Sequence, residues 1–322
     1  MKSPIKRRRV INRGRLLTLL GAAIAIGAAP MPSYALEPMT VGYYGSDATL
    51  AAFIAKEEGF FEKHGIDATL KQMSGVSTAA PLALVAGSVQ VISASFPTAV
   101  LAAEQGLDVK ILAGTTVSAP GFHIAALVRR PELDITTAKD VEGHTVGVAG
   151  INNFLHVLMV RWLGDNGADP AKVHFIEVGM PQMADLLRSG QIDAATPVEP
   201  VTTRLLSSGA GKLVAYYTDG LPAGISAYVL MIGGNYAAAH AETVVAFRAA
   251  LDDGLAWYHA HPDEVDAMLV KYLRLPIEVL RASPKAPYDN KISTQQVAFW
   301  IDEMTKQKLL SQPLDPARVV VP

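Results

Sequence analysis

The sequence contains no cysteine among its 322 residues. This absence excludes disulfide bonds, thiolate catalysis, cysteine-ligated metal sites and a lipid on an N-terminal cysteine. Basic residues are scarce after position 35. Seven of the 28 precede Leu36, which leaves 21 against 30 acidic residues and a net charge of −9 for the rest of the chain. Such an acidic body argues against nucleic acid or an anionic membrane surface as a partner.

Long apolar runs are missing as well. The run Leu16–Ala29 has 14 residues, fewer than the roughly 20 that span a bilayer. It follows a basic stretch, and Ser33-Tyr34-Ala35 then places small residues at the −3 and −1 positions of a cleavage site. This pattern predicts a signal peptide over residues 1–35, cleaved near Ala35, and a periplasmic chain without membrane insertion. An uncleaved anchor is the alternative, and Arg7-Arg8-Arg9 fits twin-arginine export as well as the general route.

Short β-rich runs then alternate with helical patterns, which is typical of a mostly parallel sheet covered by helices. The predicted strands are 39–43, 66–72, 89–95, 109–114, 122–129, 145–149, 173–178, 192–196, 213–217 and 225–232. The predicted helices are 48–58, 78–86, 98–104, 153–166, 181–189, 198–208, 239–261, 262–273 and 294–308. The fold class is therefore α/β.

The order of these units predicts two lobes. Residues 36–129 and 222–322 form the first, discontinuous lobe, and residues 130–221 form the second. The chain crosses between them twice, near Arg130-Pro131 and near Leu221-Pro222, where glycine and proline suit a hinge.

In open α/β sheets, ligands bind beyond the carboxyl ends of the strands, where helices begin. Serine, asparagine, glycine and proline recur in these loops, and helix capping alone explains residues of this kind. A ligand site requires in addition that loops of both halves face one cleft. Aromatic residues in and beside the loops suit a flat ligand. Asp47 and Glu199 oppose a strong anion unless they cap helices or accept a hydrogen bond from the ligand, so the sequence leaves the ligand's charge open.

Signals for an enzyme or a metal site are weak. The sequence has no His-Glu-x-x-His motif, no Gly-x-Ser-x-Gly elbow and no phosphate-binding loop. His259 and His261 end a predicted helix, where an exposed histidine is common. We therefore expect no catalytic residue, no metal and no cofactor. A secreted enzyme on the same scaffold is the alternative, and a sensor module for a membrane kinase is a third possibility.

Four segments in order resemble the ABC-transporter substrate-binding proteins of the sulfonate/nitrate/taurine and thiamine-pyrimidine-precursor type. They are 55–67 (AKEEGFFEKHGID), 83–91 (ALVAGSVQV), 138–148 (AKDVEGHTVGV) and 190–200, with Gly190-Gln191-Ile192-Asp193-Ala194 and Glu199-Pro200. The resemblance covers residues 39–260.

This resemblance implies a two-lobed periplasmic-binding-protein fold of type II that captures a small organic anion or a flat heterocycle. It implies a small-molecule ligand and the membrane permease of an ABC transporter as partners, with the chain acting as a monomer. The ligand contacts that it implies are Tyr44, Ser46, Ser74, Phe96, Pro97, Asn152, Asn153 and Glu199.

Overall fold

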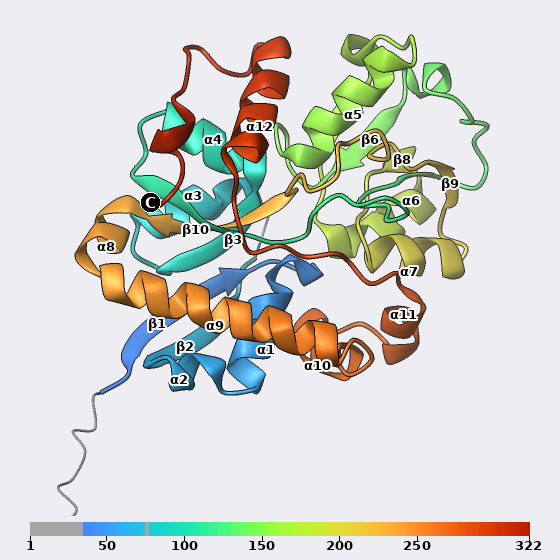
Figure 1. Cartoon of the computed structure of the whole chain (residues 1–322). Helices are drawn as coiled ribbons and strands as arrows, with labels where there is room; N and C mark the ends of the chain where they lie inside the picture. Colours follow the sequence, from blue (N-terminus) through green and yellow to red (C-terminus); the bar gives the residue numbers. More distant parts are fainter. Residues whose placement is uncertain (1–34, 75–76) are drawn as a thin grey trace, which may run out of the picture. The chain divides into compact units, whose positions relative to one another are not determined.

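The computed structural model describes residues 35–74 and 77–322 (Figure 1). The predicted signal peptide therefore lies outside the described residues, except for Ala35. Within the described ranges, none of the helices combines the length and the apolar character needed to cross a bilayer.

The described chain contains two five-stranded sheets. The first has the order β2-β1-β3-β10-β4, and β10 alone runs antiparallel to its neighbours. Its strands are β1 (Glu37–Tyr43), β2 (Ile66–Gln72), β3 (Val91–Ser95), β4 (Val109–Gly114) and β10 (Tyr228–Gly233).

The second sheet has the order β7-β6-β8-β5-β9, and β5 is its antiparallel strand. Its strands are β5 (Leu127–Arg129), β6 (Thr145–Val148), β7 (His174–Glu177), β8 (Ala194–Ala195) and β9 (Lys212–Ala215). The predicted α/β class with mostly parallel sheets is confirmed. In each sheet, the antiparallel strand is the first strand that the chain forms after it crosses over from the other sheet.

Helices cover the sheets (Figure 1). They are α1 (Leu50–Glu57), α2 (Phe60–Lys63), α3 (Ala80–Val85), α4 (Phe96–Glu104), α5 (Phe154–Asp165), α6 (Met183–Ser189), α7 (Val201–Ser207), α8 (Gly234–Ala239), α9 (Ala241–Ala260), α10 (Val265–Leu273), α11 (Ile277–Ala282) and α12 (Thr294–Lys306). The sequence pattern did not predict α2, α8 and α11, which have four to six residues each and are too short to show a helical period.

Local sequence explains where the longer helices begin and which face they bury. In α12, the Ser293 side chain accepts a hydrogen bond from the Gln296 amide at 3.2 Å, as an N-cap does. Val297, Trp300 and Met304 follow at helical spacing, and all three are buried. This face packs on α4, which itself covers the first sheet.

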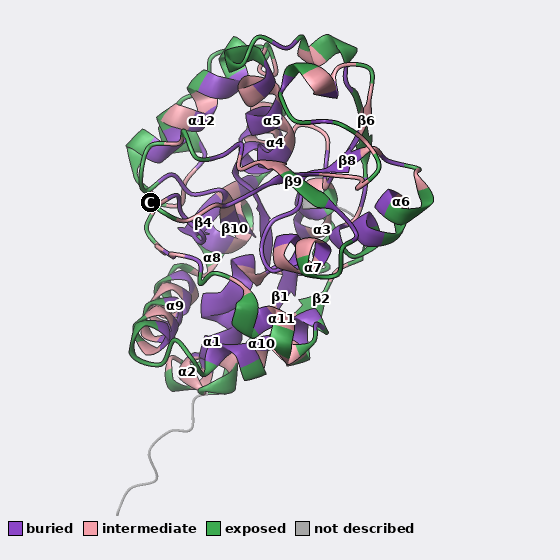
Figure 2. Ribbon diagram, turned by 90° about the vertical axis from the view of Figure 1, so that its right-hand side faces the viewer, coloured by how far each residue is buried: buried purple, intermediate pink, exposed green. Residues whose placement is uncertain are grey.

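One apolar cluster includes buried residues of both sheets, among them Ile92 of β3 and Val146 of β6, and also Phe154 of α5. A second cluster fills the other face of the first sheet, beneath α1 and α9. Figure 2 shows the strands largely buried, with exposed residues on outer helix faces and turns.

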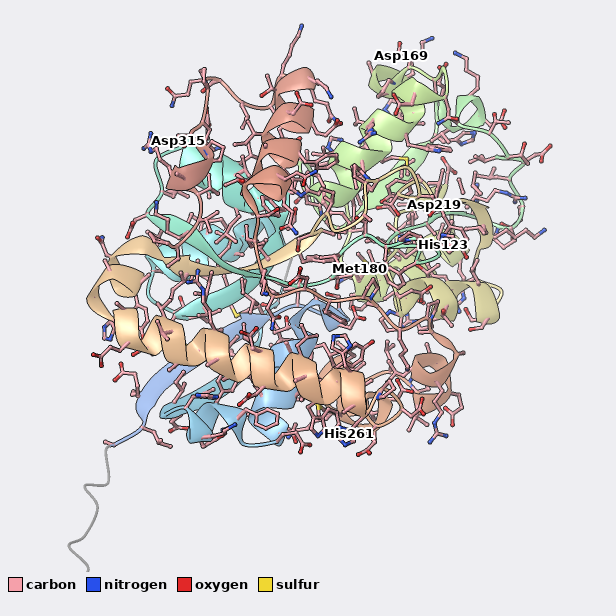
Figure 3. The ribbon with its side chains drawn as sticks, viewed as in Figure 1. His123, Asp169, Met180, Asp219, His261 and Asp315 are labelled. Atoms are coloured by element: carbon pink, nitrogen blue, oxygen red, sulfur yellow. The ribbon has the colours of Figure 1, made fainter. Side chains whose placement is uncertain are left out.

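Two segments connect the sheets, residues 115–126 and residues 216–227, and they are hydrogen-bonded to each other. The Ser118 amide donates to the Ile225 carbonyl at 2.9 Å, and the Gly224 amide donates to the Ser118 carbonyl at 2.7 Å. His123 Nδ1 lies 2.7 Å from Asp219 Oδ1 (Figure 3). Residues 122–126 bond instead to scattered partners, Ala119, Thr218 and Pro197, so the predicted strand 122–129 is shortened to Leu127–Arg129.

Candidate functional site

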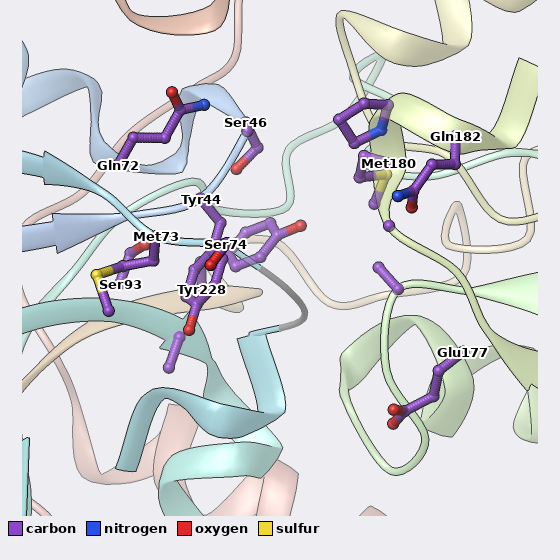
Figure 4. A pocket seen from close by; sticks show the side chains of 15 residues that line it. Tyr44, Ser46, Gln72, Met73, Ser74, Ser93, Glu177, Met180, Gln182 and Tyr228 are labelled. Atoms are coloured by element: carbon purple, nitrogen blue, oxygen red, sulfur yellow. The ribbon is translucent and has the colours of Figure 1, made fainter. Parts of the chain in front are cut away.

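A cavity of about 460 Å³ lies where loops of the two sheets face each other (Figure 4). The first sheet contributes Tyr44, Gly45, Ser46, Gln72, Met73, Ser74, Ser93, Ala94 and Tyr228. The other wall consists of Ala149, Glu177, Gly179, Met180, Pro181 and Gln182. Most of these residues lie at or just beyond the carboxyl ends of β1, β2, β6 and β7, where open α/β sheets bind ligands.

The wall of the first sheet is built around a tight turn after β1. The Ser46 amide donates to the Tyr44 carbonyl at 2.8 Å, and Ser46 Oγ accepts from the Ala48 amide at 3.4 Å. Burial raises the pKa of the Tyr44 phenol. Burial and then the nearby Asp47 carboxylate raise the pKa of Tyr228 well above its usual range. Both phenols therefore stay neutral at physiological pH and can donate or accept a hydrogen bond.

The opposite wall presents polar side chains from β7 and from the loop that follows it. Figure 4 shows Glu177, Gln182 and Met180 on this wall, facing Tyr44 and Ser46. Glu177 is exposed, and its Oε1 accepts a hydrogen bond from the Ile151 amide at 2.8 Å. The wall thus carries one carboxylate, one amide and the thioether of Met180.

The start of α5 belongs to the same region, but its backbone amides already have acceptors within the chain. The Asn152 amide donates to His156 Nδ1 at 3.2 Å, and the Phe154 amide donates to Ser95 Oγ at 2.9 Å. The His156 amide donates to Asn153 Oδ1 at 3.1 Å. Burial lowers the pKa of His156 to about 4, so the ring is neutral and its Nδ1 can accept.

A smaller void of about 20 Å³ lies between the Glu199-Pro200 turn and α10, and besides Asp266, which pairs with Lys285, two carboxylates line it. They belong to Asp47, just after Ser46, and Glu199, whose Oε2 caps α7 by accepting from the Thr203 amide at 3.1 Å. Burial, followed by the charge of Glu199, raises the pKa of Asp47 to about 6. Burial also raises the pKa of Glu199.

Three of the predicted contact residues, Tyr44, Ser46 and Ser74, line the cavity. Phe96 is fully buried and stacks on Trp300 with 6.0 Å between the ring centroids. Pro97 is buried in the first turn of α4.

The other predicted residues lie behind the second wall. Asn152 has a positive φ of 62°, Asn153 is the N-cap of α5, and Glu199 lines the smaller void rather than the cavity. The side chains of Asn153 and Glu199 accept hydrogen bonds from the His156 and Thr203 amides, and the Asn152 amide donates to His156.

The residues that sequence reasoning missed include Gln72, Ser93, Glu177 and Gln182. Glu177 lies inside the predicted strand 173–178, whereas β7 ends at Glu177. A polar residue at the end of a strand faces the edge of the sheet where ligands bind, and this position could have indicated Glu177 as a site residue.

Residues 48–265 match the family model described as NMT1/THI5 like. This match spans more than half of the chain. The chain belongs to the NMT1/THI5-like family.

One curated relative is similar to most of this chain. The bicarbonate transport ATP-binding protein CmpC of Synechocystis is 27% identical over 244 residues. That alignment covers 70% of this chain but 35% of CmpC, so the chain spans about a third of that relative's length.

Two solved structures show the same fold. The periplasmic aliphatic sulphonate binding protein SsuA of Escherichia coli has a TM-score of 0.71 at 17% identity, over 88% of this chain and 97% of that one. The ligand binding component of an ABC-type import system from Staphylococcus aureus, with zinc bound, has a TM-score of 0.76 at 14% identity, over 89% and 97%. The chain therefore has the two-lobed periplasmic-binding-protein fold.

The zinc belongs to the Staphylococcus aureus protein. In residues 35–74 and 77–322 of this chain, no three histidine, aspartate or glutamate side chains are grouped to hold a metal ion. His261, at the end of α9, instead stacks on Trp257 with 4.7 Å between the ring centroids (Figure 3).

Proposed function

We propose that this chain is the periplasmic solute-binding component of an ABC importer. One observation carries the proposal: loops from two separate sheets line one cavity of about 460 Å³, a volume suited to a small organic molecule. The family membership and the likeness to import and binding proteins support it. The membrane permease of the importer is the proposed partner, and the chain acts as a monomer.

Capture proceeds by closure of two lobes, one built on each sheet. We take their bounds as 36–114 with 228–322 and 127–215, instead of the predicted 36–129 with 222–322 and 130–221, because β5 (Leu127–Arg129) belongs to the second sheet. A solute that touches both walls binds the closed form more tightly than the open form. This difference in binding free energy shifts the equilibrium toward the closed form. The segments 115–126 and 216–227 serve as the hinge.

We assign ligand contacts to Tyr44, Ser46 and Ser74 on one wall and to Glu177 and Gln182 on the other. Asn152, Asn153 and Glu199 position the second wall, and Phe96 and Pro97 support the first. The ring of Tyr44 together with Met73 and Met180 provides flat apolar surface for a small organic anion or a flat heterocycle, the two ligand classes under test.

The test begins with protein purified from the periplasm and examined by native mass spectrometry. We expect one small molecule per chain, recovered chemically unaltered after denaturation. Tyr44→Ala should weaken rebinding at least tenfold by calorimetry, whereas Tyr236→Ala, in α8 and outside the cavity, should not.

Two results would contradict the proposal. A bound molecule that is converted during incubation would favour the alternative, a secreted enzyme on this scaffold. Equal affinity of Tyr44→Ala and Tyr236→Ala would place the binding site elsewhere.

A further inference from the structure

The charges around the cavity are of one sign. Among its described lining residues, Glu177 is the one with a charged side chain, and lysine, arginine and histidine are absent from that set. The neighbouring void adds Asp47 and Glu199. Lys285, which also lines the void, is paired with Asp266, and the nearby His123 is paired with Asp219.

At the start of α5, the bonded backbone amides do not compensate for this excess of negative charge. An anion at the start of a helix is held by free N–H groups of the first turn. At α5, the amides of Ile151, Asn152, Asn153, Phe154 and His156 all donate to acceptors of the chain itself. An anionic solute would have to displace the Glu177 carboxylate to reach the Ile151 amide.

The same geometry suits a cation. Glu177 Oε1 is used by Ile151, and Oε2 accepts no hydrogen bond from the described residues. The carboxylate is exposed on the wall opposite Tyr44 (Figure 4), and the face of an aromatic ring attracts a cation as well.

We infer that the cavity selects a cationic solute, a protonated amine or amidine, and that Glu177 sets this preference. The inference rests on the proposed binding function and decides between its two ligand classes. It favours a protonated, nitrogen-containing molecule over an organic anion.

The absence of cysteine in the chain allows a test that does not depend on knowing the solute. A single cysteine is introduced as Gln182→Cys in the cavity wall. Its reaction rates are measured with two methanethiosulfonate reagents, one carrying a trimethylammonium group and one a sulfonate group. Leu82→Cys, on the uncharged helix α3 where Leu82 is 64% exposed, is the reference site.

We expect the ratio of the cationic to the anionic rate to be at least tenfold higher for Gln182→Cys than for Leu82→Cys. Adding Glu177→Gln, which keeps an oxygen acceptor for the Ile151 amide, should lower that ratio at least threefold. Equal ratios at the two sites, or a ratio that Glu177→Gln leaves unchanged, would overturn the inference.

Failure of the inference can be told apart from failure of the proposed function. An anionic solute recovered by native mass spectrometry would overturn the cation preference and leave the binding function intact. A high ratio of the cationic to the anionic reaction rate, in a chain that binds no solute, would support the cation preference of the cavity. The same result would count against the binding function.

Discussion

The backbone amide of Phe154 donates a buried hydrogen bond of 2.9 Å to the side chain of Ser95. Ser95 ends β3 in the first sheet, and Phe154 begins α5 beside the second. The bond therefore joins the first sheet to the helix beside the second sheet, independently of the crossing segments.

Ser95→Ala should lower the free energy of unfolding by about 1–2 kcal/mol, because it leaves the Phe154 amide buried without an acceptor. Urea denaturation measures the loss, and Ser207→Ala on the exposed surface of α7 is the matched control. A loss no larger than that of the control would mean that the bond contributes nothing to stability.

Ser118 links the two crossing segments through its side chain as well as its backbone. Its Oγ accepts from the Ile225 amide at 2.9 Å and donates to the Pro222 carbonyl. Ser118→Ala should speed hydrogen exchange at the Ile225 amide at least tenfold, since the acceptor is lost. Unchanged exchange at Ile225 would show that the segments do not depend on this side chain.

Asp47→Asn should stabilise the chain at pH 8 by about 2–3 kcal/mol. The pKa of Asp47 is about 6 in the fold against 3.8 ordinarily. The stability that the protonated carboxyl contributes is therefore present below pH 4 and is lost as the pH rises through 6. The variant mimics the protonated form. The gain, measured by denaturation at both pH values, should vanish near pH 4, and a gain of equal size at pH 4 would contradict this account.

The charge of Glu199 contributes to the raised pKa of Asp47, so the two substitutions should not be additive. In a double-mutant cycle with Glu199→Gln at pH 8, we expect a coupling of about 0.5–1 kcal/mol. Additive effects would mean that the two carboxylates do not interact.

His156 should give stability the opposite dependence on pH. Its pKa is lowered to about 4, and the neutral ring accepts from the Asn152 amide. The stability that it contributes is present above pH 6.5 and is lost as the pH falls through 4. His156→Asn, which keeps an acceptor, should lose less stability than the parent chain between pH 7 and pH 4. An equal loss in both proteins would place the titrating group elsewhere.

Periodicity and glycine positions were sufficient to predict most of the regular structure. The strands Ile66–Gln72 and Val109–Gly114 have the predicted bounds, because an alternating or continuous set of apolar residues ends at polar residues or glycine there. The helix before Gly190 ends as predicted, with that residue in the left-handed region at φ 72°. Only glycine adopts this conformation without strain.

Side-chain direction at the site was harder to predict. Phe96 and Tyr44 both follow strands and both are aromatic, yet Phe96 turns into the core against Trp300 while Tyr44 lines the cavity. The choice depends on α12, which lies about 200 residues further along the chain. Likewise, the contact between Glu177 and the Ile151 amide depends on the pairing of β6 with β7, which no local pattern reveals.

The apolar cluster that includes residues of both sheets has a consequence for how the molecule melts. Loss of the second sheet together with α5 would expose first-half residues of this cluster, among them Ile92 of β3 and Phe96 of α4, so neither half can unfold and leave the other fully covered. Heating should therefore give one calorimetric peak, with equal calorimetric and van't Hoff enthalpies.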